Sequence, residues 1–140
     1  MKIVIDTNRI IAALIKDGIS RKIIFNEKFQ FVTPDHSITE INNHRSDIIL
    51  KTAISDTELE LLLSFIFEKI EIIPEEDYID YLERADKLIS DIDDAPFIAL
   101  SLASKADGIW SDDSHFLEQN QVKIWQTKDI ITFLDSTPHS

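Results

Sequence analysis

The sequence predicts a single three-layer α/β domain, an α/β/α sandwich in which helices cover both faces of a mostly parallel five-stranded sheet. Short β-branched apolar runs alternate along the chain with longer segments of helical periodicity, which is the pattern of βαβ units. The length of 140 residues suits one domain, and a hydrophobic content of 44% supplies an ordinary core. With only two glycines and four prolines, the loops are expected to be short. We therefore expect one domain over residues 1–135, followed by a C-terminal tail at 136–140.

Five segments have the composition of strands. Residues 2–5 (Lys-Ile-Val-Ile) form a β-branched apolar run, which predicts a strand buried on both faces. Because helical segments separate most of the consecutive strands, we expect the strands to run mostly parallel. The other predicted strands lie at residues 30–33, 70–73, 109–110 and 122–125.

The segments between the strands predict helices. Asp6, Thr7 and Asn8 are suitable N-caps for a helix over residues 9–16. The clearest helix spans residues 94–106, where apolar side chains recur every three or four positions and Pro96 falls in the first turn. Residues 75–90 are predicted to form one amphipathic helix. Further helices are expected at residues 20–26, 35–44 and 47–54, from Asp56 or Thr57 to 69, and at 128–134, with fraying at 137–140.

Composition and charge exclude several classes of protein. The chain has no cysteine, which rules out disulfides, thiolate zinc sites and cysteine nucleophiles. Its longest apolar stretch, residues 59–67, is interrupted by Glu60 and Ser64 and is too short to span a membrane. The acid at position 6 comes too early for a signal peptide. We therefore expect a cytoplasmic enzyme or interaction domain that does not contact membranes.

The net charge of −12 is unevenly distributed. Residues 1–51 carry a small positive excess, whereas residues 52–140 carry almost all of the negative charge. A chain this acidic is a poor nonspecific binder of nucleic acid. Most of the acids over residues 56–86 are expected to lie on solvated helix faces. The remaining acids occur at strand ends and helix starts, where they suggest a site.

Acidic residues from four separate segments are predicted to meet at one edge of the sheet. Asp6 ends the first strand, and Asp112 and Asp113 follow the fourth. Glu40 lies early in the helix that leaves the second strand. Asp94 opens a helix that runs antiparallel to the strands, so its N-terminus faces their carboxyl ends. Ligands of open parallel sheets bind at this edge.

Such a cluster of carboxylates is unfavourable unless something neutralises it. Two unit charges about 4 Å apart repel by about 4 kcal/mol at an effective dielectric constant of about 20. Protonation, a basic neighbour or a bound metal relieves this repulsion. Hard oxygen ligands favour Mg²⁺ or Mn²⁺, and carboxylate-held divalent ions suit phosphoryl chemistry. The structural alternatives are helix caps at Asp6 and Asp94, a solvated helix face at Glu40 and a turn at Asp112–Asp113.

Four segments that carry these acids also resemble a known family. Residues 3–8 (Ile-Val-Ile-Asp-Thr-Asn), Glu40, residues 94–100 (Asp-Ala-Pro-Phe-Ile-Ala-Leu) and residues 110–116 (Trp-Ser-Asp-Asp-Ser-His-Phe) occur in that order. In this arrangement the chain resembles PIN-domain proteins, the nuclease fold of many type II toxin–antitoxin toxins (VapC-like). The alignment makes Asp113 the fourth acid, with a hydroxyl two residues before it and phenylalanine three residues after it.

The resemblance also implies a fold, a reaction and a set of residues. The implied strand order is 3-2-1-4-5, and the implied reaction is metal-dependent hydrolysis of RNA. An RNA substrate, a cognate antitoxin protein and a homodimer are the implied partners. Catalysis and binding of one or two Mg²⁺ or Mn²⁺ ions are assigned to Asp6, Glu40, Asp94 and Asp113. Support is assigned to Thr7, Asn8 and Ser111, with Asp91 and Asp112 as second-tier candidates.

The basic residues and histidines provide weaker candidates for substrate contacts. The best candidates for a phosphate-binding stripe are Arg9, Lys16, Arg21, Lys22 and Lys28. Most histidines are expected at the surface, although His36 or His115 could approach a substrate. His115 also departs from the family pattern, because an acid is frequent at its position. Ser111 is the less common hydroxyl residue at its position, and Ile41 stands where leucine usually follows the second acid.

A second class of function remains open from sequence, and other phosphoryl-transfer enzymes fit the sequence less well. A non-catalytic PIN-like domain that binds protein or acts as a scaffold would retain the same fold. Haloacid-dehalogenase-type phosphatases need a second aspartate at the position where Asn8 stands. Receiver domains need a phosphoacceptor aspartate after the third strand, and Pro74, Glu75 and Glu76 stand there instead. A glycine-rich phosphate loop is excluded because the chain has only two glycines.

Overall fold

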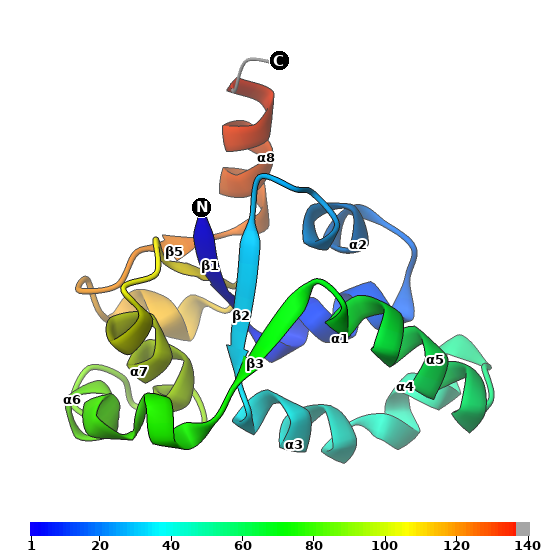
Figure 1. The fold of residues 1–140 in the computed structure, drawn as a ribbon, viewed down its shortest axis with the longest axis horizontal. Coiled ribbons are helices and arrows are strands. Elements are labelled where there is room, and N and C mark those ends of the chain that lie inside the picture. Colours follow the sequence, from blue (N-terminus) through cyan, green and yellow to red (C-terminus); the bar gives the residue numbers. More distant parts are fainter. Residues whose placement is uncertain (137–140) are drawn as a thin grey trace.

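A computed structural model describes residues 1–136 of the protein (Figure 1). Helices and strands alternate along the chain as the sequence predicts. In chain order the elements are β1 (Lys2–Ile5), α1 (Thr7–Ile15), α2 (Ile19–Ile24), β2 (Gln30–Pro34), α3 (His36–Asn43), α4 (Arg45–Thr52), α5 (Asp56–Phe67), β3 (Ile70–Ile73), η1 (Glu75–Asp77), η2 (Ile79–Tyr81), α6 (Leu82–Asp86), α7 (Ala95–Ser104), β4 (Ile109–Trp110), η3 (Ser114–Glu118), β5 (Ile124–Trp125) and α8 (Thr127–Ser136). In the described residues no helix has the length and apolar content needed to cross a membrane.

The five strands form one sheet in the order β3-β2-β1-β4-β5. All four neighbouring pairs are parallel. The predicted α/β fold class and the strand order are therefore confirmed. The central strand β1 pairs with β2 on one side and with β4 on the other, so that the ends of these three strands lie at one edge. This topology brings residues that follow β1, β2 and β4 into one region.

The two faces of the sheet are covered by separate hydrophobic cores. Because successive side chains of a strand point to opposite faces, Ile3 and Ile5 of β1 enter one core and Val4 enters the other. The first core packs against α1–α5 and α8 and includes Trp110, and the second packs against α6 and α7. The three β1 residues are completely buried, which confirms a central strand covered on both faces.

One predicted helix, over residues 75–90, is wrong. The chain instead forms the two short 3-10 turns η1 and η2 and then the five-residue helix α6. The Tyr78 hydroxyl donates a hydrogen bond of 2.6 Å to Asp35 Oδ1, and the Glu75 amide donates one of 3.1 Å to Asp35 Oδ2. These contacts hold Tyr78 against the end of β2, with only 2% of its surface exposed. Tertiary contacts therefore override the helical periodicity of the segment.

Several predicted boundaries also move by one to four residues. Helix α1 begins at Thr7, so that Asp6 alone precedes it. Helix α5 is capped by Ser55 and not by Asp56 or Thr57, because Ser55 and Glu58 form a reciprocal capping box. Helix α8 extends to Ser136. The rest of the predicted tail, 137–140, lies outside the described residues.

Smaller shifts affect four other predicted elements. Residues 47–54 were expected to be helical, and the helix there is α4, which ends before the left-handed residue Ala53. Strand β5 is shorter than predicted and begins at Ile124. Helix α2 ends at Ile24, and α7 begins one residue after Asp94. None of these shifts changes the order of the elements.

Candidate active site

The residues that follow β1, β2 and β4 gather at the carboxyl edge of the sheet. Figure 1 shows α3 leaving the end of β2, at the end of the sheet opposite the N-terminus. Asp6 directly follows β1, and its backbone amide donates to the Trp110 carbonyl at the end of β4, at 3.1 Å. Because β1 and β4 end side by side, residues 111–113 begin next to Asp6. The predicted convergence of strand ends is thus present in the fold.

Asp6 is almost entirely buried and is held by hydrogen bonds. Only 6% of its surface is exposed. The Ser111 hydroxyl donates to Asp6 Oδ2 at 2.7 Å, and the Asp113 amide donates to the Ser111 oxygen at 3.0 Å. The backbone amide of Asn8 lowers the pKa of the Asp6 carboxylate, although the Asp6 side chain makes no cap hydrogen bond to α1. Ser111 therefore connects the first and fourth predicted acids.

Glu40 reaches the same region from α3. The Thr7 hydroxyl donates to Glu40 Oε1 at 2.7 Å, which ties the first turn of α1 to α3. His36, one helical turn earlier, places its Nε2 atom 3.9 Å from Glu40 Oε1 and 3.5 Å from Asp93 Oδ1. The capping alternative for Asp6 finds no support, since its side chain makes no cap hydrogen bond to α1. Thr7 acts here as a support for Glu40.

Asp94 and Asp113 form a tighter group together with His115. One ligand atom from each of the three lies within 4.8 Å of the other two. Asp94 Oδ2 is buried and has no hydrogen-bond partner among the described residues. Asp113 is held by the amide of His115, which donates to Asp113 Oδ1 at 2.9 Å. A buried carboxylate oxygen without a donor indicates that a cation, or a proton, belongs beside it.

The pKa values show that the four acids interact as one cluster. Burial raises the pKa of Asp6 to about 6, and the negative charges of Glu40 and Asp113 raise it as well. Burial also raises the pKa of Asp94 to about 7, with contributions from Asp91, Asp113 and Asp6. The pKa of Glu40 is raised by burial, while the hydrogen bond from Thr7 lowers it. The cluster therefore stores electrostatic repulsion whenever its carboxyl groups ionise.

A divalent cation fits this set of donors. The carboxylates come from four separate segments, and the oxygen atoms are of the kind that Mg²⁺ and Mn²⁺ prefer. The imidazole of His115 adds one nitrogen donor at the exposed side of the group. A bound cation would remove the repulsion that raises the pKa values of Asp6 and Asp94. Among the described residues, Asp94, Asp113 and His115 are the group whose ligand atoms lie close enough to share one ion, whereas Asp6 and Glu40 lie outside that group.

The two second-tier acids have different surroundings. Asp112 accepts hydrogen bonds from the Thr127 amide at 2.7 Å and the Thr127 hydroxyl at 2.6 Å, and Arg9 lies 3.0 Å from it. Asp112 therefore anchors the start of α8, although it directly precedes Asp113. Asp91 lies in the turn before α7, where its carbonyl accepts the Asp94 amide at 3.0 Å. Its negative charge raises the pKa of Asp94.

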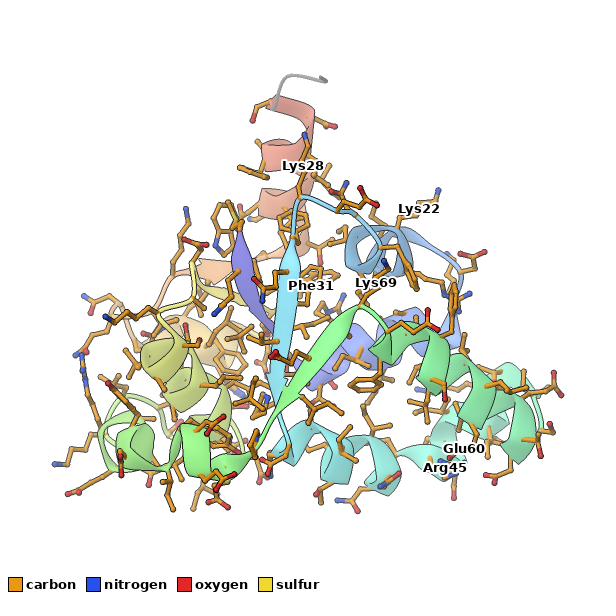
Figure 2. The ribbon with its side chains drawn as sticks, viewed as in Figure 1. Lys22, Lys28, Phe31, Arg45, Glu60 and Lys69 are labelled. Carbon is orange, nitrogen blue, oxygen red and sulfur yellow. The ribbon has the colours of Figure 1, made fainter. Side chains whose placement is uncertain are left out.

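The predicted phosphate-binding residues do not gather beside the acids. Arg9 is engaged by Asp112, and Arg21 donates two hydrogen bonds to the Ala13 carbonyl. Figure 2 shows Lys22 and Lys28 toward the amino end of the sheet, away from α3. Lys16 follows the last turn of α1, which is also the end that points away from the carboxyl edge. Of the five candidates, only Arg9 lies near that edge, in the first turn of α1.

Sequence reasoning gave too little weight to His36 and none to Asp93. His36 was grouped with the surface histidines, but only 28% of its side chain is exposed, and its Nε2 atom is buried without a hydrogen-bond partner among the described residues. The spacing of four residues between His36 and Glu40 is the signal that could have linked them, because such residues are neighbours on a helix. The proximity of Asp93 depends on the turn before α7 and has no comparable signal.

Residues 4–135 match the family model described as the PIN domain. The match covers nearly the whole chain, including the four segments that supply the acids, and the chain belongs to the PIN-domain family. Proteins of this family are generally nucleases that use divalent metal ions, in agreement with the acidic cluster. No curated protein matches the chain at a significant level.

Proposed function

We propose that this protein is a metal-dependent ribonuclease that hydrolyses RNA phosphodiester bonds. The observation that carries the proposal is the meeting of Asp6, Glu40, Asp94 and Asp113 at one edge of the sheet, where burial and mutual repulsion raise the pKa values of Asp6 and Asp94. Capping alone does not account for this arrangement, because Asp6 and Asp94 make no cap hydrogen bonds. A site for Mg²⁺ or Mn²⁺ accounts for all four acids together.

The chain's own residues would prepare the site for a cation and a phosphate. Ser111 orients Asp6, and Thr7 orients Glu40. These hydrogen bonds keep the oxygen atoms in place, so that little rearrangement accompanies binding. A divalent cation held there supplies positive charge to the phosphate and lowers the pKa of water. Without it the carboxylates would repel an RNA phosphate.

We further propose that the protein is the toxin of a toxin–antitoxin pair, with a cognate antitoxin as its partner and cellular RNA in the cytoplasm as its substrate. Membership of the PIN-domain family and the resemblance of the four acidic segments to those toxins support this role. A homodimer is part of the same proposal. Leu50 of α4 and Leu61 and Phe65 of α5 are exposed apolar side chains, which supports a protein contact on these helices.

Cleavage assays test the proposed reaction. Purified protein is incubated with a set of structured RNAs in Mn²⁺, with and without EDTA, beside the Asp6→Asn and Asp113→Asn variants. We expect metal-dependent products that carry a 5′-phosphate, and a loss of cleavage of at least 100-fold in both variants. An Asp80→Asn variant, which changes an exposed acid on η2, serves as the matched control. Cleavage that survives EDTA, or that both site variants retain, would contradict the proposal.

A non-catalytic PIN-like scaffold is the second candidate. The engagement of Arg9 and Arg21 by groups within the protein favours it, because few cations then remain near the acids to bind RNA. Calorimetric titration with Mn²⁺ separates the two candidates. Heat of binding together with an increase in the unfolding temperature supports a nuclease site, whereas the absence of both supports the scaffold.

A further inference from the structure

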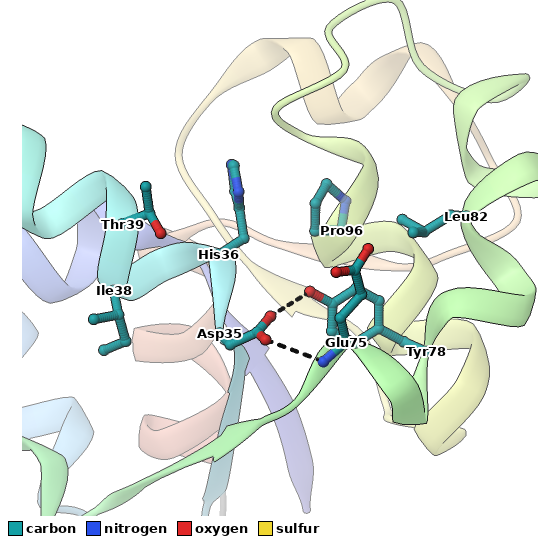
Figure 3. Close-up of a pocket in the computed structure, with 8 residues that line it drawn as sticks. All are labelled: Asp35, His36, Ile38, Thr39, Glu75, Tyr78, Leu82 and Pro96. Carbon is teal, nitrogen blue, oxygen red and sulfur yellow. Dashed lines mark hydrogen bonds between the residues drawn. The ribbon is translucent and has the colours of Figure 1, made fainter.

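A cavity lies directly beside the acidic cluster, between α3, the η1–α6 segment and the first turn of α7. Its volume is about 480 Å³, which is within the range of roughly 300–1,000 Å³ that is typical of ligand pockets. Figure 3 shows the residues that line it. They are Asp35, His36, Ile38, Thr39, Glu75, Tyr78, Leu82 and Pro96.

Two residues connect this cavity with the acids. His36 lines the cavity, and its Nε2 atom lies 3.9 Å from Glu40 Oε1. Pro96 also lines the cavity and follows Asp94 by two residues. An RNA strand whose phosphate lies at the acidic cluster would therefore bring a neighbouring nucleotide to the mouth of the cavity. The cavity is positioned as a subsite for that nucleotide.

The lining of the cavity suits a flat ring better than a phosphate. Ile38, Leu82 and Pro96 provide apolar contacts, and the half-buried ring of His36 provides an aromatic one, whereas Tyr78 is almost completely buried and only supports the wall. Bases of single-stranded RNA are commonly bound by stacking on such rings and by hydrogen bonds to their Watson–Crick edges. A phosphate is disfavoured because two carboxylates, those of Asp35 and Glu75, line the same space.

The two carboxylates of the cavity differ in their capacity to accept hydrogen bonds from a ligand. Asp35 uses one oxygen to accept the Tyr78 hydroxyl and the other to accept the Glu75 amide (Figure 3). The Glu75 carboxylate accepts no hydrogen bond from any residue in the described range 1–136, and its side chain is exposed to the cavity. Asp35 thus has a structural role, whereas Glu75 is available to accept hydrogen bonds from a ligand.

We propose that this cavity binds an unstacked guanine base of the RNA, with Glu75 as the residue that selects it. The inference rests on the proposed ribonuclease function and names the nucleotide that the site prefers. Guanine carries two adjacent donors, N1–H and N2–H₂, on its Watson–Crick edge, and both can be accepted by the two oxygens of one carboxylate. Uracil presents two carbonyl oxygens around a single N–H and would be repelled by Glu75.

Nuclear magnetic resonance tests the binding step without requiring cleavage. The ¹⁵N-labelled full chain is titrated in Mg²⁺ with guanosine, inosine and uridine 5′-monophosphates. We expect the guanosine nucleotide to shift the amide signals of residues 35–39, 75–82 and 97, with an affinity at least tenfold above that for uridine. Inosine, which lacks the N2 amino group, should bind with intermediate affinity. Equal affinities for guanosine and uridine, or shifts confined to other residues, would overturn the inference.

Two matched variants separate base recognition from catalysis. Glu75→Gln should reduce the preference for guanosine over uridine to less than threefold, while Glu76→Gln, a change of the adjacent exposed acid outside the cavity, should leave it unchanged. Both variants should bind Mn²⁺ as the unmodified protein does. In cleavage assays, the unmodified protein should have a lower KM for RNAs with guanosine beside the cleaved bond than for RNAs without it. Glu75→Gln should remove this difference in KM.

The outcomes distinguish the two proposals. Cleavage that depends on Mn²⁺ but shows the same base preference in Glu75→Gln refutes the guanine subsite and leaves the nuclease function intact. Selective binding of the guanosine nucleotide that Glu75→Gln abolishes, in a protein that cleaves no RNA, refutes the nuclease function and leaves the binding site.

Discussion

Ser111 donates a hydrogen bond of 2.7 Å to Asp6 Oδ2 across the junction between the ends of β4 and β1. The Ser111 oxygen also accepts the amide of Asp113 at 3.0 Å, so one buried hydroxyl positions two of the four acids. The family resemblance assigned Ser111 a supporting role, and the geometry shows how such support would operate.

Replacement of Ser111 by alanine should weaken metal binding. Without the hydroxyl, Asp6 loses a hydrogen bond that lowers its pKa, and its carboxylate is no longer fixed. Loss of a residue that orients a metal ligand typically costs about 10–100-fold in affinity, and we expect a loss of about tenfold for Mn²⁺ in calorimetric titration. Ser20→Ala, which alters another buried serine on α2, is the matched control. An unchanged Mn²⁺ affinity in Ser111→Ala would exclude the positioning role.

The metal-free protein should become less stable as the pH rises. The pKa of Asp6 is raised from 3.8 to about 6 by burial, so the folded state binds protons more tightly than the unfolded chain. Its stabilising contribution is therefore complete below a pH of about 4 and is lost as the pH rises through about 6. The raised pKa of Asp94, about 7, extends this loss toward neutral pH. Urea denaturation in EDTA over this pH range measures the effect.

Asp6→Asn should remove much of that pH dependence. Because the amide cannot ionise, the variant should be more stable than the unmodified protein at pH 8, by on the order of 2–3 kcal/mol. Asn can still accept the hydrogen bond from Ser111, so the fold should be retained. The exposed Asp80→Asn variant controls for the change in net charge. Equal slopes of stability against pH in Asp6→Asn and the unmodified protein would show that the Asp6 pKa is not raised.

The neighbouring residues Asp112 and Asp113 should respond oppositely to the same substitution. Asp112→Asn removes the charge that pairs with Arg9 and weakens the contacts to Thr127, which should lower the unfolding free energy by about 1 kcal/mol. Its Mn²⁺ affinity should be unchanged. Asp113→Asn removes a carboxylate from the group that could hold the metal, so it should lose Mn²⁺ affinity. The same change relieves repulsion with Asp6 and Asp94, so the unfolding free energy should not fall. Urea denaturation measures the stability of both variants, and calorimetric titration measures their Mn²⁺ affinity. Loss of Mn²⁺ affinity in Asp112→Asn, or an unchanged affinity in Asp113→Asn, would contradict the prediction.

His115 should influence which metal the site prefers. Its ligand atom lies within 4.8 Å of those of Asp94 and Asp113, and an imidazole nitrogen is a better ligand for transition-metal ions than for Mg²⁺. His115→Gln should therefore reduce the affinity for Mn²⁺ severalfold and leave that for Mg²⁺ nearly unchanged. Competition between the two ions, followed by the paramagnetic resonance of Mn²⁺, measures this ratio. His44→Gln, a change of a histidine outside the group, should have no effect.

The prediction of residues 75–90 shows where local patterns are insufficient. Apolar spacing favoured one helix, but the buried Tyr78 and its bond to Asp35, 43 positions earlier, bend the chain into short turns. Those turns form one wall of the cavity that we assign to guanine. Sequence periodicity therefore missed both the backbone of this segment and the site that it builds.

The convergence of the acids was more accessible to sequence reasoning. A β-branched run followed by Asp6 marks a strand end, and the alternation of strands and helices makes neighbouring strands parallel. Parallel strands end at one edge, so acids at those ends come together without knowledge of any side-chain contact. The distinction between Asp112 and Asp113 was not accessible in this way, because it depends on Thr127 in α8.

The sequence by itself determined the order of the strands, the order of the helices outside residues 75–90, and the positions of Asp6, Glu40, Asp94 and Asp113 at or near the ends of these elements. Propensity, periodicity and capping act over a few residues, and these are sufficient for such features. The tertiary structure alone decided that Ser111 reaches Asp6, 105 positions away, that Asp112 turns toward α8, and that His36 lies between the acids and a cavity. Contacts of this kind form only when the layers pack, because packing brings together side chains that are remote along the chain.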